Sequence, residues 1–110
     1  MFTSGKVALI TGGKRIGAVV ATTLAKAGVD IALVYNRSRD EAEETAAEVR
    51  KLGSRTFTVQ ADVTSEGECN YAVASTIRDL GRLDILINMA SLYTAKPFDQ
   101  LTAADWDRQL

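Results

Sequence analysis

A short glycine-rich run, Thr11–Gly17 (TGGKRIG), is where this sequence offers the clearest chemistry. It lies between an apolar segment and an amphipathic one, so it predicts a strand-to-helix turn. Backbone N–H groups at a helix N-terminus lack partners, and glycines let a phosphate approach them closely. The alternative is a glycine-rich turn without a ligand. A P-loop is excluded, because Ala18 and Val19 follow where Lys and Ser or Thr are required. The candidate phosphate-binding residues are Gly12, Gly13, Lys14, Arg15, Ile16 and Gly17.

The segment Tyr35–Ser38 (YNRS) follows the second apolar run and indicates which phosphate would bind. An Asp or Glu about 20 residues after the glycines usually holds a free ribose 2′-hydroxyl. Here Arg37 stands 20 residues after Gly17, with Asn36 and Ser38 beside it. A guanidinium and a hydroxyl at a helix start suit a 2′-phosphate, so we predict NADP(H) as the cofactor. The alternative is a solvated Arg37 next to a Ser38 that only caps the helix. The missing acid also argues against an S-adenosylmethionine-binding domain.

The elements that would position these residues alternate between strands and helices. Short apolar runs bounded by turn residues predict strands, and capping boxes and glycines mark helix ends. Strands are predicted over Lys6–Thr11, Asp30–Tyr35, Arg55–Gln60 and Leu83–Asn88. Helices are predicted over Arg15–Ala27, from the Ser38 and Glu41 capping box to Gly53, from the Ser65 and Glu68 capping box to Gly81, and from Thr102 onward.

The apolar residues of each predicted helix recur at helical spacing, which indicates one face turned to a core. These are Ile16, Val19, Val20, Leu24 and Ala27 in the first helix; Ala42, Thr45, Ala46, Val49 and Leu52 in the second; and Cys69, Val73, Thr76, Ile77 and Leu80 in the third. A β-α-β-α-β-α-β-α order with right-handed crossovers gives an α/β fold with a doubly wound parallel sheet. The expected strand order is 3-2-1-4.

Composition restricts the class of protein further. The 110 residues carry a net charge of −1, which argues against nucleic acid or an anionic membrane surface as a partner. The absence of histidine excludes Ser-His-Asp and Cys-His catalysis within the chain and disfavours a zinc site, so we predict no metal. The single cysteine, Cys69, makes the cytoplasm the expected compartment. No apolar run approaches the roughly 18 residues of a membrane span.

The end of the chain bears on its domain organisation. Leu110 falls about two turns into the last predicted helix, with no capping residue after it. We therefore expect residues 1–110 to be the N-terminal, dinucleotide-binding part of one domain that continues further. The alternative is a short natural chain with a frayed end.

Four motifs in order resemble the short-chain dehydrogenase/reductase family. Thr11–Gly17 resembles the family's Thr-Gly-x-x-x-Gly-x-Gly loop, although it is one residue short. Ala61–Thr64 (ADVT) resembles the motif after the third strand, and Asn88–Ser91 (NMAS) stands where Asn-Asn-Ala-Gly is usual. Asp105–Asp107 (DWD) resembles the start of the fourth long helix. The basic loop and the Arg-Ser pair look most like the NADPH-dependent pteridine reductase or 3-oxoacyl carrier-protein reductase branch.

The resemblance implies a Rossmann fold and roles for further residues. Asp62 would accept a hydrogen bond from the adenine amino group, with Val63 beside the ring. Asn88, Ala90 and Ser91 would run past the nicotinamide ribose. Each has a structural alternative: Asp62 as a helix-start carboxylate, Asn88 as a link between strands, and Ser91 as a plain loop residue.

The resemblance also implies the reaction, a hydride transfer from NADPH to a carbonyl or C=N substrate such as a pterin. The family's Tyr-x-x-x-Lys pair is absent, because none of Tyr35, Tyr71 and Tyr93 has a lysine four residues later. We therefore assign no catalytic residue and predict that this segment alone is inactive. The parent protein would be an oxidoreductase and a homo-oligomer, dimer or tetramer. The competing hypothesis is a stand-alone, non-catalytic dinucleotide-binding module or sensor.

Overall fold

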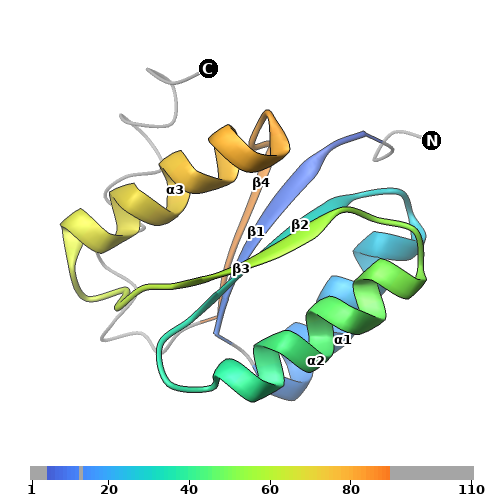
Figure 1. Cartoon of the computed structure of the whole chain (residues 1–110), viewed down its shortest axis with the longest axis horizontal. Coiled ribbons are helices and arrows are strands. Elements are labelled where there is room, and N and C mark those ends of the chain that lie inside the picture. Colours follow the sequence, from blue (N-terminus) through green and yellow to red (C-terminus); the bar gives the residue numbers. More distant parts are fainter. Residues whose placement is uncertain (1–4, 13, 90–110) are drawn as a thin grey trace.

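The computed structural model describes residues 5–12 and 14–89, and the predicted helix from Thr102 lies outside these ranges. Four strands alternate with three helices along the described chain (Figure 1). The strands are β1 (Val7–Gly12), β2 (Asp30–Tyr35), β3 (Thr56–Gln60) and β4 (Ile85–Met89). The helices are α1 (Lys14–Lys26), α2 (Arg39–Lys51) and α3 (Glu66–Leu80).

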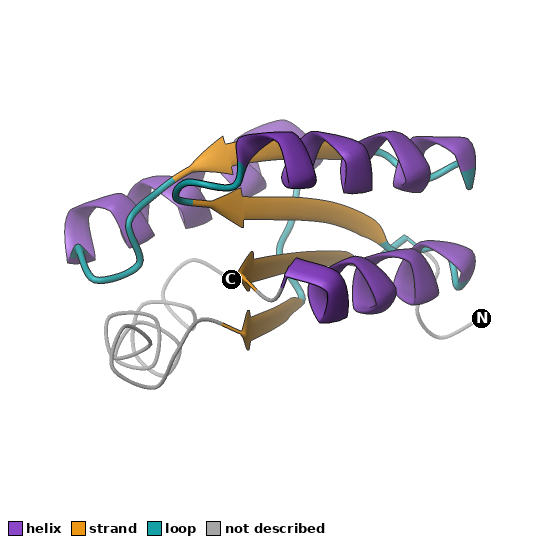
Figure 2. Cartoon of the chain, turned by 90° about the horizontal axis from the view of Figure 1, so that it is seen from below, coloured by secondary structure: helices purple, strands orange, loops and turns teal. Residues whose placement is uncertain are grey.

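The strands form one parallel sheet in the order β3-β2-β1-β4, so the predicted order 3-2-1-4 is confirmed. Figure 2 shows the four strands pointing the same way. α1 and α2 cover one face of the sheet and α3 covers the other (Figure 1). All carboxyl ends of the strands therefore meet at one edge, where the glycine-rich run and Tyr35–Ser38 were predicted to lie.

Two apolar cores, one on each face, follow from the alternation of side chains along β1 and β2. Val7 and Leu9 face α3, whereas Ala8 and Ile10 face α1 and α2. All four are at most 1% exposed. A fully buried aliphatic side chain of Val or Leu size contributes about 1.5–3 kcal/mol, so both faces of β1 contribute to the stability of the sheet.

α1 packs differently from the prediction. Its buried line is Gly17, Ala21 and Ala25, whereas Ile16 and Val19 are each 64% exposed. Small residues at intervals of four let the helix axis come close to the sheet, which leaves the larger side chains on the flanks. The prediction that Ile16 and Val19 face the core is therefore wrong.

The other two helices follow the predicted faces more closely. Ala46 and Val49 of α2 are fully buried, but Leu52 is 40% exposed because it stands at the C-cap, after the last helical turn. In α3, Cys69, Thr76 and Leu80 are buried, and Val73 and Ile77 pack against the same core.

Helix ends show which capping predictions hold. Gly28, Gly53 and Gly81 all have positive φ, as expected of glycines that end helices. The Ser65 hydroxyl accepts a hydrogen bond from the N–H of Glu68, 3.3 Å away. The predicted capping box at Ser38 is wrong, because its side chain makes no cap hydrogen bond.

Two acidic side chains fix the amino end of the sheet. Asp84 accepts hydrogen bonds from the Val7 N–H at 2.9 Å and from Arg82 at 2.7 Å. Asp30 accepts from the N–H and the guanidinium of Arg55, which are 2.8 and 2.9 Å away. These contacts set the positions of β4 against β1 and of β3 against β2, far from the carboxyl edge.

Candidate functional site

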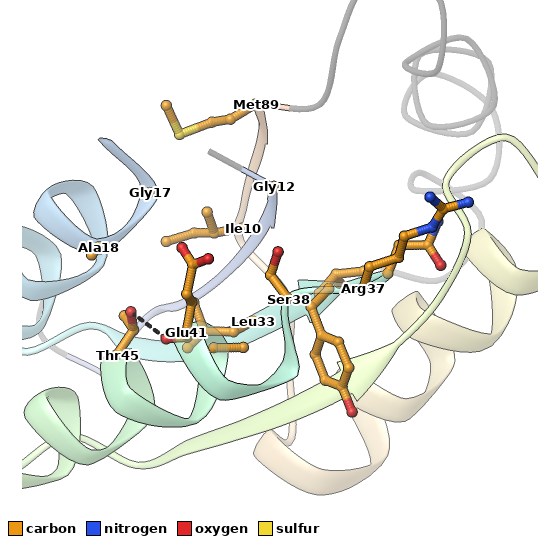
Figure 3. A pocket seen from close by; sticks show the side chains of 14 residues that line it. Ile10, Gly12, Gly17, Ala18, Leu33, Arg37, Ser38, Glu41, Thr45 and Met89 are labelled. Carbon is orange, nitrogen blue, oxygen red and sulfur yellow. Dashed lines mark hydrogen bonds between the residues drawn. The ribbon is translucent and has the colours of Figure 1, made fainter. Parts of the chain in front are cut away.

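A groove of about 620 Å³ lies at the carboxyl ends of β1 and β2, between α1 and α2 (Figure 3). In open α/β sheets, ligands bind at the carboxyl edge of the strands, so this is the expected place for a cofactor. The groove is lined by Ile10, Gly12, Gly17, Ala18, Leu33, Val34, Tyr35, Asn36, Arg37, Ser38, Glu41, Ala42, Thr45 and Met89.

The glycine wall of the groove is built by a close approach of α1 to the end of β1. Gly12 ends β1 with φ +62°, a left-handed conformation that favours glycine. A Cβ on Gly17 would lie 2.6 Å from the Gly12 carbonyl oxygen, closer than atoms can pack. Both positions therefore need glycine, and Gly17 and Ala18 of α1 line the groove beside Gly12.

The other residues predicted in this loop lie differently. Gly13 is outside the described residues, and Lys14 begins α1. Arg15 and Ile16 are exposed and do not line the groove.

The opposite wall is formed by the segment after β2. Asn36, Arg37 and Ser38, all predicted as site residues, line the groove. Ser38 stands at the N-cap of α2, but its hydroxyl makes no cap hydrogen bond and projects towards the groove in Figure 3. The Asn36 carbonyl accepts a hydrogen bond from the Gln60 side chain at 3.1 Å, which ties this loop to the end of β3.

Glu41, predicted only as the capping-box partner of Ser38, is also a groove residue. It stands in the first turn of α2 and lines the groove together with Ser38. Residues three apart in a helix lie on the same side, and this spacing is the signal that identifies it. Figure 3 shows its carboxylate extending from α2 towards the end of β1.

Asp62 and Val63 follow β3 but do not line this groove. Hydrogen bonds from the Thr64 hydroxyl at 2.6 Å and the Thr64 N–H at 2.9 Å hold the pKa of Asp62 below its usual range. The nearby charge of Arg37 lowers that pKa further. Val63 packs partly buried against the α3 core, and its carbonyl oxygen accepts a hydrogen bond from the Cys69 thiol at 3.4 Å.

Asn88, predicted near a nicotinamide ribose, joins two strands. Its side-chain oxygen accepts a hydrogen bond from the Thr11 hydroxyl at 2.8 Å, between paired residues of β1 and β4. The neighbouring Met89 lines the groove. Ala90 and Ser91 lie outside the described residues.

Comparison with known proteins decides the family. The sequence pattern of the family described as short chain dehydrogenase matches residues 6–110. The chain belongs to the short-chain dehydrogenase family. The Bacillus subtilis protein called short-chain dehydrogenase/reductase homolog YusS is 40% identical over 103 residues, which cover 93% of this chain and 94% of that protein.

Solved structures of the family include both kinds of nicotinamide complex. A short chain dehydrogenase from Burkholderia cenocepacia in complex with NADP is 39% identical, with a TM-score of 0.77 over 83% of this chain and 38% of that one. An NAD⁺-bound xylitol dehydrogenase is also 39% identical, with a TM-score of 0.72 over 78% of this chain and 33% of that one. Other curated relatives are longer, and the chain spans 30 to 40% of their length.

Three further properties of the described residues concern the cysteine thiol, metal binding and membrane spans. Burial, together with the charges of Asp62, Glu68 and Glu66, raises the pKa of Cys69 to about 11, so the thiol stays protonated at neutral pH. Among residues 5–12 and 14–89, no group of His, Cys, Asp and Glu side chains could hold a metal ion. No helix within the same residues is long and apolar enough to cross a membrane.

Proposed function

We propose that this chain is the NADP(H)-binding part of a short-chain oxidoreductase. The observation that carries the proposal is the pairing of Arg37 and Ser38 on one wall of the groove with Gly12 and Gly17 on the other. The segment Tyr35–Ser38 contains no carboxylate that would hold a ribose 2′-hydroxyl or repel a 2′-phosphate.

The glycine wall fits a pyrophosphate. The first turn of α1 presents unpaired backbone N–H groups and the positive end of the helix dipole. The close contact between Gly17 and the Gly12 carbonyl leaves no room for a side chain at the point where the phosphates would approach. Gly13, Lys14, Arg15 and Ile16 stay in the proposed phosphate-binding loop as its flanking residues.

The wall after β2 fits a 2′-phosphate. The Ser38 hydroxyl makes no cap hydrogen bond, and the preceding residue, Arg37, is exposed and carries a guanidinium. A charge-assisted hydrogen bond contributes about 1.5–3 kcal/mol. At about 1.4 kcal/mol per decade, Arg37 alone would favour NADP(H) roughly 10- to 150-fold.

The remaining predicted residues would contact the two ends of the cofactor. Asp62 has one carboxylate oxygen, Oδ1, engaged by Thr64, which leaves Oδ2 as the acceptor for an adenine amino group. Val63 would lie beside that ring, and Asn88, Ala90 and Ser91 beside the nicotinamide ribose. When bound, NADPH supplies the hydride, and the chain's own residues bind and orient it.

The parent enzyme would reduce a carbonyl or C=N substrate. The basic glycine loop and the Arg37–Ser38 pair favour the pteridine reductase or 3-oxoacyl carrier-protein reductase branch, acting as a homo-oligomer in the cytoplasm. Catalytic residues would lie outside this chain, because it has no Tyr-x-x-x-Lys pair.

The test is a titration of NADP⁺ and NAD⁺ into the wild-type chain and the Arg37→Asp variant at one fixed salt concentration. We expect the wild type to prefer NADP⁺ and the variant to lose or reverse that preference. Arg39→Asp is the matched control, since Arg39 is exposed, two residues away, and outside the groove lining. Equal affinities in the wild type, or an unchanged ratio in Arg37→Asp, would refute NADP(H) selection by Arg37.

A second candidate is a non-catalytic dinucleotide-binding module. It is favoured by the missing Tyr-x-x-x-Lys pair and by YusS, which this chain matches over 94% of that protein's length. The chain alone should bind cofactor without turnover. If the pure chain oxidised NADPH in the presence of a ketone or a pterin, both proposals would be contradicted: the binding part of an enzyme whose catalytic residues lie elsewhere, and the non-catalytic module. A Tyr-x-x-x-Lys in the reading frame after Leu110 would favour the enzyme.

A further inference from the structure

The Glu41 carboxylate is the negative group of the groove. Glu41 is the one acidic residue and Arg37 the one basic residue among the described residues that line it. Within the described chain, the Glu41 carboxylate has no hydrogen bond and no ion pair, although the Glu41 carbonyl accepts from the Thr45 hydroxyl at 3.0 Å. Other glutamates are engaged: Glu43 accepts from Thr58, and Glu48 pairs with Lys51.

The two charges point to different parts of the groove. In Figure 3 the Glu41 carboxylate extends towards Ile10 and the glycine wall, whereas Arg37 extends away from that wall. Ser38 lies between them. A phosphate held at the start of α1 would therefore meet the helix N-terminus and an unneutralised carboxylate across the groove.

We propose that Glu41 is a specificity-determining residue that lowers affinity in proportion to the phosphate charge of the ligand. The inference rests on the proposed function, because it concerns the same groove. A carboxylate repels each phosphate group and has little effect on an uncharged nucleoside. Glu41 would therefore oppose Arg37: it limits how tightly the groove binds dinucleotides, and it reduces the preference for the extra phosphate of NADP(H).

A charge-graded series of ligands tests this proposal. Adenosine, NAD⁺ and NADP⁺ are titrated into the wild-type 110-residue chain and the Glu41→Gln variant at low salt. The expected gain in affinity is negligible for adenosine, about twofold for NAD⁺ and about fivefold for NADP⁺, the range of exposed charge interactions. The gains should shrink in high salt, where such interactions are screened. Glu41→Lys should enlarge both dinucleotide gains.

The matched control is Asp40→Asn. Asp40 is exposed in the same first turn of α2, so the substitution removes the same charge near the same helix end, but Asp40 does not line the groove. Unfolding temperatures of both variants check that the fold is kept.

The outcomes separate the two proposals. The inference is supported if Glu41→Gln and Glu41→Lys gain affinity in the order adenosine, NAD⁺, NADP⁺ and Asp40→Asn does not. If the wild type binds dinucleotides but Glu41→Gln and Asp40→Asn change the affinity equally, this inference alone is overturned. Gains that are the same for adenosine and NADP⁺ also overturn it. Failure of every protein to bind either dinucleotide overturns the proposed function and the inference together.

Discussion

Gly17→Ala should destabilise the chain although alanine is the better helix former. In an exposed helix interior this change gains about 1 kcal/mol. Here the new Cβ would lie 2.6 Å from the Gly12 carbonyl oxygen, a backbone atom that cannot move without displacing the end of β1. Overpacking of this kind costs about 1–3 kcal/mol, and the loss of the close approach between α1 and the sheet adds to it. We expect a net loss of about 1–2 kcal/mol.

Thermal unfolding by circular dichroism measures the effect. A net loss of about 1–2 kcal/mol lowers the unfolding temperature of a domain this size by roughly 4–16 °C. Gly67→Ala is the control, because Gly67 is an exposed helical glycine of α3 whose Cβ would meet only the Ser65 hydroxyl at 4.0 Å. It should leave stability unchanged or raise it. A Gly17→Ala variant as stable as the wild type would refute the close approach as the reason for glycine there.

Two ionisable groups give further predictions. Burial opposes ionisation of Asp84, but hydrogen bonds from Arg82 and the Val7 N–H outweigh it and lower its pKa. The contribution of Asp84 to the free energy of unfolding is therefore fully present above its pKa in the unfolded chain, about 4, and is lost as pH falls through its lower pKa in the folded chain. Asp84→Asn should cost about 1 kcal/mol at neutral pH and reduce the acid sensitivity of unfolding; equal pH profiles would contradict this. Burial raises the pKa of Cys69 to about 11. The stability that the buried, protonated thiol contributes to the fold is therefore lost as pH rises from about 9 to 11. Alkylation near pH 8 should be at least about a hundredfold slower in the folded chain than in urea, and similar rates would show that Cys69 is accessible.

Much of the fold could be predicted from the sequence because the two central strands, β1 and β2, are buried on both faces. Both ends of the strand Asp30–Tyr35 were predicted correctly, because a glycine turn before the apolar run and polar residues after it mark where the strand begins and ends. Strand order followed from right-handed crossovers between parallel strands. The face of α1 could not be predicted this way. Hydrophobic spacing favours the large residues Ile16 and Val19, whereas close packing selects the small ones.

The candidate site was predictable in its walls but not in its details. Glycines and the Arg37–Ser38 pair identify both walls from residue type and spacing alone. The free hydroxyl of Ser38 was not foreseen, because a Ser three residues before a Glu predicts a capping box and gives no sign of which bonds form. Glu41 was predicted only as the capping-box partner of Ser38, although the same helical turn brings it into the lining of the groove.

The most direct test of dinucleotide binding in the groove is a map of backbone amide shifts. NADP⁺ is titrated into the isotope-labelled chain and followed by two-dimensional nuclear magnetic resonance. We expect saturable shifts at Gly12, Gly17 and Ser38, at the carboxyl edge of the sheet, and little change at Arg55 or Arg82 at the amino end. An absence of saturable shifts at the glycine wall, or shifts confined to the amino end, would contradict it.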